Sequence, residues 1–135
     1  MDRIETQLAI HADPDRVFDE ITHPENIPLY APGIEEAHQR PPQAPQAAGN
    51  LLDLVTRSGD RMEGEIVDRQ ANRSWAVEDE NGTVARWSLE EGEDGTLATF
   101  VLEGDFDPET ERELRSEMRA KIARLVLDLE QAGRS

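Results

Sequence analysis

The side chains best suited to catalysis or metal binding are few and scattered in this sequence. Histidine occurs only at His11, His23 and His38, and no two of them have the spacing of a zinc site. The chain contains no cysteine, which rules out thiolate ligands, a cysteine nucleophile and disulfides. We therefore expect neither a bound metal nor a cofactor. His23, which precedes Pro24, is a candidate helix cap instead.

Motifs for hydrolysis and for phosphate binding are also missing. None of the serines at 58, 74 and 88 lies in a Gly-x-Ser-x-Gly elbow, which a Ser/His/Asp hydrolase of that kind would need. The glycine-containing pieces "ENG" at 80–82 and "GEDG" at 92–95 indicate turns rather than phosphate loops, because no basic residue or helix start follows them.

The acidic runs at 78–80 and 90–94 indicate solvated hairpin ends. Asp79 and Glu103 nevertheless occupy strand phases that could face inward near an edge of a sheet. A carboxyl group buried there would have a raised pKa. Both placements, exposed edge and inward-facing, are kept as alternatives for these two residues.

Length and charge restrict the class of protein. A chain of 135 residues predicts one domain, residues 1–135. Its net charge of −16 opposes binding to nucleic acid or to an anionic membrane surface. We find no apolar run long enough for a signal peptide or a membrane span, so a cytoplasmic location is expected.

Lys121 is the only lysine in the chain. This composition fits either a high-salt cytoplasm or an arginine-rich chain from a GC-rich genome.

Hydrophobic periodicity and turn residues predict the order of the elements. The expected order is a strand, two short helices, about six further antiparallel strands and one long helix. Strands are expected at 3–12, 34–40, 51–57, 61–69, 74–80, 83–91 and 96–104, and helices at 14–22, 24–30 and from 108 to a stop at Gly133. Residues 41–50, rich in Pro, Ala and Gln, predict a mobile loop.

The long helix presents a single apolar stripe, which a curved sheet would bury. That stripe consists of Leu114, Met118, Ile122, Leu125, Val126 and Leu129. The strand phases place a complementary set on the inner face of the sheet: Leu52, Leu54, Thr56, Met62, Gly64, Ile66, Trp75, Val77, Ala85, Trp87 and Leu89. The last strand is ambiguous, and we favour Phe100 and Leu102 inward over Leu97 and Val101 because their side chains are bulkier.

Three stretches carry a resemblance to a known superfamily. They are "IHADPDRVFDEITHPENIPLYAPGI" near the start, "DGTLATFVLEGDF" in the last predicted strand, and the long helix from Pro108. Together they resemble the START-like or helix-grip (SRPBCC) superfamily, most closely its polyketide cyclase/dehydrase branch, which also contains lipid-transfer and quinone-binding members. The resemblance implies an α+β fold with a curved antiparallel sheet of about six to seven strands, two short helices and a long C-terminal helix.

The resemblance also implies a cavity between the long helix and the sheet, which binds a hydrophobic or aromatic molecule. The candidate cavity residues are Tyr30, Leu54, Met62, Ile66, Trp75, Trp87, Leu89, Phe100, Met118, Ile122 and Val126. The alternative for each of them is ordinary core packing, and for Tyr30 a structural role. The expected partner is this small molecule, with neither nucleic acid nor a membrane span, and the chain is expected to be a monomer or a homodimer.

Whether this chain catalyses a reaction stays open at this point. Cyclases of the branch are thought to use a tyrosine and an arginine in the cavity, and those places fall near Ile34 and Asp68 here. Neither residue matches, so no catalytic residue is assigned. The hypotheses are binding of a lipid-, quinone- or polyketide-like molecule without chemistry, a cyclase/dehydratase-type enzyme, and a partner-binding module of a larger complex.

Overall fold

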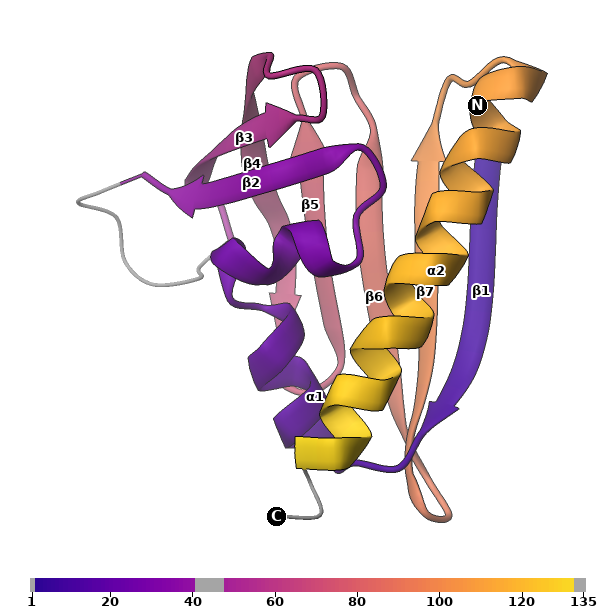
Figure 1. The fold of residues 1–135 in the computed structure, drawn as a ribbon. Coiled ribbons are helices and arrows are strands. Elements are labelled where there is room, and N and C mark those ends of the chain that lie inside the picture. Colours follow the sequence, from indigo (N-terminus) through magenta and orange to yellow (C-terminus); the bar gives the residue numbers. More distant parts are fainter. Residues whose placement is uncertain (1, 41–47, 133–135) are drawn as a thin grey trace.

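A curved antiparallel sheet holds a long helix against its concave face (Figure 1). The computed structural model describes residues 2–40 and 48–132. The elements are, in order, β1 (Asp2–Ile10), α1 (Pro14–Ile21), the 3-10 helix η1 (Pro24–Leu29), β2 (Ile34–Gln39), β3 (Leu51–Thr56), β4 (Arg61–Gln70), β5 (Ser74–Asp79), β6 (Val84–Gly92), β7 (Gly95–Gly104) and α2 (Pro108–Ala132).

The seven strands form one sheet in the order β1-β7-β6-β5-β4-β3-β2, with every neighbouring pair antiparallel. The α2 helix crosses the concave face diagonally, and α1 and η1 lie on the same side, next to it (Figure 1). This arrangement confirms the predicted α+β helix-grip fold. No helix of residues 2–40 and 48–132 is long and apolar enough to span a membrane.

The two short helices begin where the prolines predict, but their caps differ from the prediction. Asp13 is the N-cap residue of α1, and its carbonyl accepts the amides of Arg16 and Val17, but its side chain makes no capping bond. His23 does not cap η1 with its side chain either. Its ring Nδ1 lies 2.8 Å from the carbonyl oxygen of Asp19, in α1.

The long helix has the side-chain cap that α1 lacks. The Asp107 carboxylate accepts the amide of Thr110 at 2.7 Å, and this bond lowers the pKa of the Asp107 carboxyl below its ordinary value. Two further predictions lie outside the described residues: the helix stop at Gly133, and all but the last three residues of the loop at 41–50.

The predicted strand phases agree with the burial of the side chains. Trp75 pairs with Trp87, and Trp87 pairs in turn with Phe100, so three large aromatic residues lie side by side on the inner face. Phe100 and Leu102 point inward, which resolves the ambiguity of the last strand as favoured from the sequence. Val101, on the outer face, is still largely covered.

Candidate ligand-binding pocket

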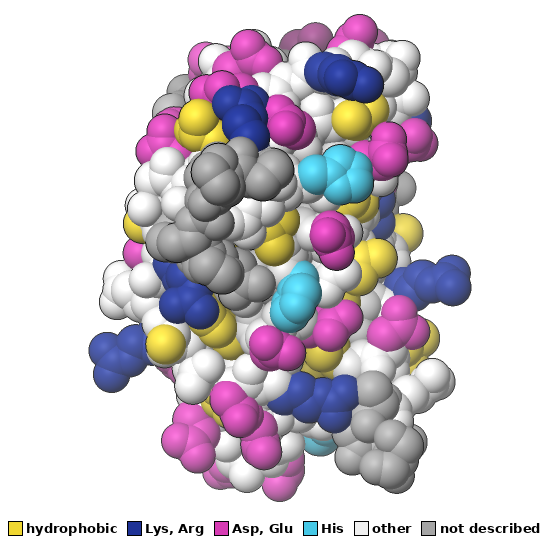
Figure 2. Space-filling model, turned by 90° about the vertical axis from the view of Figure 1, so that its left-hand side faces the viewer, with side chains coloured by type: hydrophobic (Ala, Val, Ile, Leu, Met, Phe, Trp, Pro, Cys, Tyr) yellow, Lys and Arg dark blue, Asp and Glu magenta, His cyan; other side chains and the backbone are white. Residues whose placement is uncertain are grey.

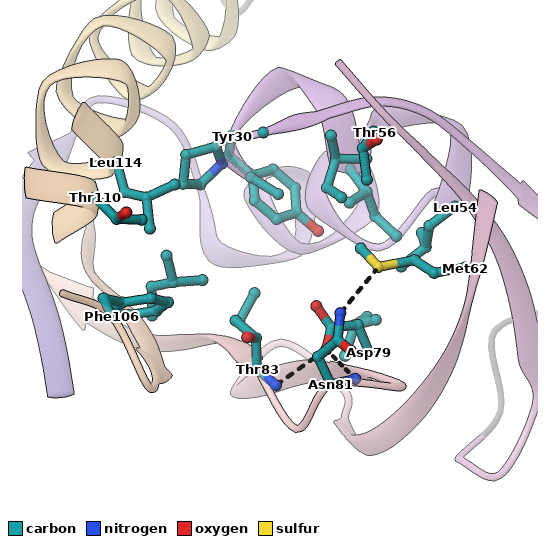
Figure 3. A pocket seen from close by; sticks show the side chains of 18 residues that line it. Tyr30, Leu54, Thr56, Met62, Asp79, Asn81, Thr83, Phe106, Thr110 and Leu114 are labelled. Atoms are coloured by element: carbon teal, nitrogen blue, oxygen red, sulfur yellow. Dashed lines mark hydrogen bonds between the residues drawn. The ribbon is translucent and has the colours of Figure 1, made fainter. Parts of the chain in front are cut away.

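A pocket of about 450 Å³ lies at the end of the sheet where α2 begins (Figure 3). Its wall is formed by η1, by the turn after it, by strands β2 to β7, by the connection between β7 and α2, and by the first turns of α2. The lining residues are Ile27, Tyr30, Ala31, Pro32, Gly33, Ile34, Leu54, Thr56, Met62, Val77, Asp79, Asn81, Thr83, Ala85, Leu102, Phe106, Thr110 and Leu114. This volume lies within the range typical of small-molecule sites.

The end of β5 and the turn that follows it supply half of the polar side chains of the pocket, namely Asp79, Asn81 and Thr83 (Figure 3). The Oδ1 atom of Asp79 accepts the backbone amides of Asn81 at 2.8 Å and of Thr83 at 3.0 Å. The amide of Gly82 donates to the Asp79 carbonyl at 3.0 Å, which closes the turn. Asn81 also extends its side-chain amide to the Met62 sulfur at 3.9 Å. The sequence predicted this Asn-Gly hairpin but not that it borders the pocket.

Phe106, in the connection between β7 and α2, covers one side of the pocket. Its amide donates to the Asp2 carboxylate at 2.9 Å, which ties the connection to β1. The ring packs over Gly104, where a Cβ atom would lie 2.9 Å from the Phe106 ring and 2.9 Å from the Thr83 hydroxyl. The absence of a side chain at residue 104 is therefore what allows Phe106 to reach the pocket.

Two side chains of α2 fasten the turn between η1 and β2, which forms another part of the wall. Lys121 Nζ donates to the carbonyl oxygens of Ala31 at 2.9 Å and of Ile34 at 3.2 Å. Glu117 accepts the amide of Gly33 and forms an ion pair with Arg57. Partial burial, and to a lesser degree the nearby Arg57, lowers the pKa of Lys121 below its ordinary value.

We expect Lys121→Met to lower the free energy of unfolding by about 1–2 kcal/mol, because two carbonyl groups lose a charged donor. The lowered pKa means that the unfolded chain binds more protons than the folded chain just below the ordinary lysine pKa of 10.5. Stability contributed by Lys121 therefore rises as the pH approaches 10.5, and the loss in the variant should be larger at pH 10.5 than at pH 7. Urea unfolding at both pH values measures this difference.

Arg124→Met is the matched control for that experiment, since Arg124 is exposed on the same helix. Its loss should stay within about 0.5 kcal/mol at either pH. An equal, pH-independent loss in both variants would contradict the fastening role of Lys121.

Tyr30 separates the pocket from the aromatic core. Its side chain is buried, and its hydroxyl donates to the Ile21 carbonyl at 2.9 Å and accepts the Trp75 indole N–H at 3.0 Å. The ring contacts Trp87 and Phe100 edge-on, with centroids 5.5 Å away in both cases. Burial raises the pKa of this phenol well above its ordinary value. The hydroxyl is thus neutral and already engaged on both sides.

Tyr30→Phe is expected to lower the free energy of unfolding by about 1–3 kcal/mol, because a buried indole N–H and a buried carbonyl lose their partner while the packing is preserved. Chemical unfolding measures this loss. The same substitution made in a Trp75→Phe background should cost less, because one of the two bonds is then already absent. Equal losses in both backgrounds would show that the hydrogen bond between the Tyr30 hydroxyl and the Trp75 indole does not contribute to stability.

The structure divides the eleven predicted cavity residues into two groups. Tyr30, Leu54 and Met62 line the pocket. Ile66, Trp75, Trp87, Leu89, Phe100, Met118 and Ile122 are buried in the core cluster, against which Val126 packs. Ile122 and Val126 also border a separate groove between α2 and β1. The middle of α2 therefore packs onto the sheet, and the open space lies beside its first turns.

The two positions that depart from the cyclase pattern have different surroundings. Ile34 lines the pocket. Asp68 follows a bulge in β4 and pairs with Ala76; its carboxylate accepts an Arg86 N–H at 3.1 Å. Because Arg86 alternates with the inward-facing Trp87, this ion pair lies on the outer face of the sheet. The Ser74 hydroxyl, then Gln70 and Arg86, lower the pKa of the Asp68 carboxyl.

Within residues 2–40 and 48–132, the remaining chemistry-bearing side chains do not converge on a second site. The three histidines are all exposed: His11 follows β1, His23 directly precedes η1, and His38 lies in β2. Glu103 alternates with the inward-facing Leu102 and so lies on the outer face, whereas Asp79 faces the pocket. Within the part of the chain that the structure describes, no three His, Asp or Glu side chains are grouped so that they could hold a metal ion.

A curved antiparallel sheet that grips a long C-terminal helix beside an apolar pocket defines a START-like, helix-grip protein. Residues 1–131 match the family model described as polyketide cyclase / dehydrase and lipid transport, and the chain belongs to this family. No curated protein matches the sequence.

Several solved structures share the fold at low sequence identity. The Aha1 dimer from Colwellia psychrerythraea has a TM-score of 0.72 and 14% identity, over 96% of this chain and 97% of that one. Protein NE0264 from Nitrosomonas europaea has a TM-score of 0.72 and 13% identity over the whole of both chains. DynU16, described as a protein in the dynemicin biosynthetic locus, has a TM-score of 0.66 and 16% identity, over 92% of this chain and 46% of that one.

Proposed function

We propose that this chain binds a hydrophobic or aromatic small molecule, lipid-, quinone- or polyketide-like, and does not transform it. The observation that carries the proposal is the composition of the pocket wall. Among the lining residues, all of which belong to the described part of the chain, most are apolar and Asp79 alone is charged. A wall of this kind binds mainly through shape and buried apolar area.

The same wall argues against the alternative, a cyclase or dehydratase, since acid–base catalysis of that kind usually needs a donor and an acceptor near the reacting atoms. The ionisable side chains that line the pocket are Tyr30 and Asp79. Tyr30 is a poor candidate because its hydroxyl is bonded to Ile21 and Trp75 and its pKa is raised. Asp79 would remain without a second group.

Ala85→Trp tests the proposal, because Ala85 lines the pocket from the inner face of β6 and an indole there would occupy the ligand's space. Binding of the neutral dye Nile red, followed by fluorescence, should weaken by about tenfold or more. Gly64 is less suitable, since a Cβ atom there would lie 2.8 Å from Leu54 and would disturb packing rather than fill space. Should tryptophan overpack the site, Ala85→Leu is the smaller substitute.

Ser88→Trp is the matched control, because Ser88 is exposed on the outer face of the same strand. It should leave dye binding unchanged. Unchanged binding in Ala85→Trp, with the variant folded, would place the ligand elsewhere. Time-dependent conversion of a bound polyketide mimic, abolished by Asp79→Asn, would replace the binding role with the enzymatic one.

A further inference from the structure

The charge inside the pocket carries an inference about which ligands it accepts, and this inference rests on the binding function proposed above. We propose that the pocket selects apolar molecules whose polar end is an uncharged or cationic hydrogen-bond donor, such as an alcohol, a phenol or an amine. Carboxylates and other anions of the same size are rejected. Asp79 is the residue that sets this selection.

Asp79 lines the pocket with its carboxylate held in one orientation. Asp79 is the last residue of β5, and it lines the pocket together with Asn81 (Figure 3). Val77, two residues earlier in β5, lines the pocket as well. The turn amides of Asn81 and Thr83 engage its Oδ1 atom and hold the side chain in one orientation. This leaves Oδ2 to accept a bond from a ligand. A carboxylate held in this way is a fixed acceptor at the polar end of the pocket.

No basic side chain lines the pocket to neutralise the charge of Asp79. None of the residues that line the pocket, all of them within the described ranges, is a lysine, an arginine or a histidine. Two basic side chains that lie next to lining residues, Arg57 and Lys121, are already engaged. Arg57 pairs with Glu117, and Lys121 donates to the carbonyls of Ala31 and Ile34. An anionic ligand end would therefore meet a like charge without a counterion.

The apolar surroundings strengthen this discrimination. Leu54, Met62 and Val77 lie on the neighbouring wall, so the charge of Asp79 acts in a medium less polarisable than water. A donor on the ligand gains a charge-assisted hydrogen bond there, which is stronger than a neutral one. An acid of the same chain length instead loses its hydration and gains repulsion.

Displacement of Nile red by decanol, decylamine and decanoate at physiological salt tests the proposal. Decanol and decylamine should displace the dye at concentrations about tenfold or more below that of decanoate. In Asp79→Asn the amide oxygen can accept the same two turn amides, so the hairpin is preserved while the charge is lost. The affinity for decanoate should then rise to within about threefold of that for decanol.

Glu78→Gln is the matched control, because Glu78 is exposed on the outer face of the same strand and the substitution changes the net charge equally. It should bind decanol in preference to decanoate to the same extent as the unmodified chain. Asp79→Ser provides a second variant with a turn-forming hydroxyl if Asp79→Asn does not fold.

The outcomes separate this inference from the proposed function. Equal displacement by decanol and decanoate in the unmodified chain overturns the selection and leaves hydrophobic binding intact. Discrimination that persists in Asp79→Asn, or that disappears in Glu78→Gln, overturns the role of Asp79. If Nile red does not bind and Ala85→Trp changes nothing, the binding function itself fails, and the inference fails with it.

Discussion

Phe100→Ala is expected to lower the free energy of unfolding by about 3–5 kcal/mol, a large fraction of the stability of a domain of this size. Phe100 is 0% exposed, and its ring centroid lies 4.8 Å from that of Trp87 and 5.5 Å from that of Tyr30. Alanine would lose the buried area, leave a void and remove both aromatic contacts. Urea unfolding measures the loss, and Phe100→Leu should recover part of it.

Leu97→Ala is the control on the same strand. Leu97 pairs with Ala9 and Glu90, is partly exposed and lies on the outer face, so its truncation should cost about 1 kcal/mol or less. A larger loss for Leu97→Ala than for Phe100→Ala would mean that β7 presents the opposite face to α2, and similar losses would contradict the predicted difference between its two faces.

The succession of elements and the inner face of the sheet were predictable because each rests on a local signal. Alternation along β3, β5 and β6 indicated which residues face inward, and Trp75 and Trp87 are indeed fully buried. Proline and aspartate marked the helix starts at Pro14 and Pro108. Alternation alone did not decide the phase of β7, because both of its faces are apolar and both are partly covered.

The position of the pocket was not predictable in the same way. Periodicity places Met118 and Ile122 on the buried side of α2, but it does not say whether they touch the sheet or leave a space. That depends on the tilt of the helix against the sheet. The pocket lies beside the start of α2, where Thr110, Leu114 and the preceding Phe106 line it.

Residues outside regular elements were missed for a related reason. Phe106 and Asn81 lie in connections, where alternation carries no information about direction. The signals that could have indicated them are a glycine two residues before Phe106 and the Asx pattern of the Asn-Gly hairpin. The face of the sheet on which Asp68 lies was harder still to predict from the sequence. The bulge between Ile66 and Asp68 changes which face the following residues occupy.

Potassium chloride is expected to stabilise this protein strongly, because acidic residues outnumber basic ones by 30 to 14. The net charge is −16, and Figure 2 shows acidic side chains at both ends and in the middle of one face, with fewer basic ones between them. Ion pairs such as Arg40 with Asp53 and Glu63 are exposed, and each contributes about 1 kcal/mol or less. Screening weakens these pairs, but it relieves a larger total repulsion.

Thermal melts in increasing potassium chloride measure the balance of these two effects. The Debye length falls from about 10 Å at 0.1 M to about 3 Å at 1 M, and we expect the midpoint to rise by about 5 °C or more over this range. A triple variant with glutamine at the exposed positions Glu90, Glu91 and Glu93 should show a smaller rise, because three of the repelling charges are gone. A midpoint that stays flat would exclude adaptation to high salt, leaving genome composition as the explanation for a single lysine, Lys121, beside thirteen arginines.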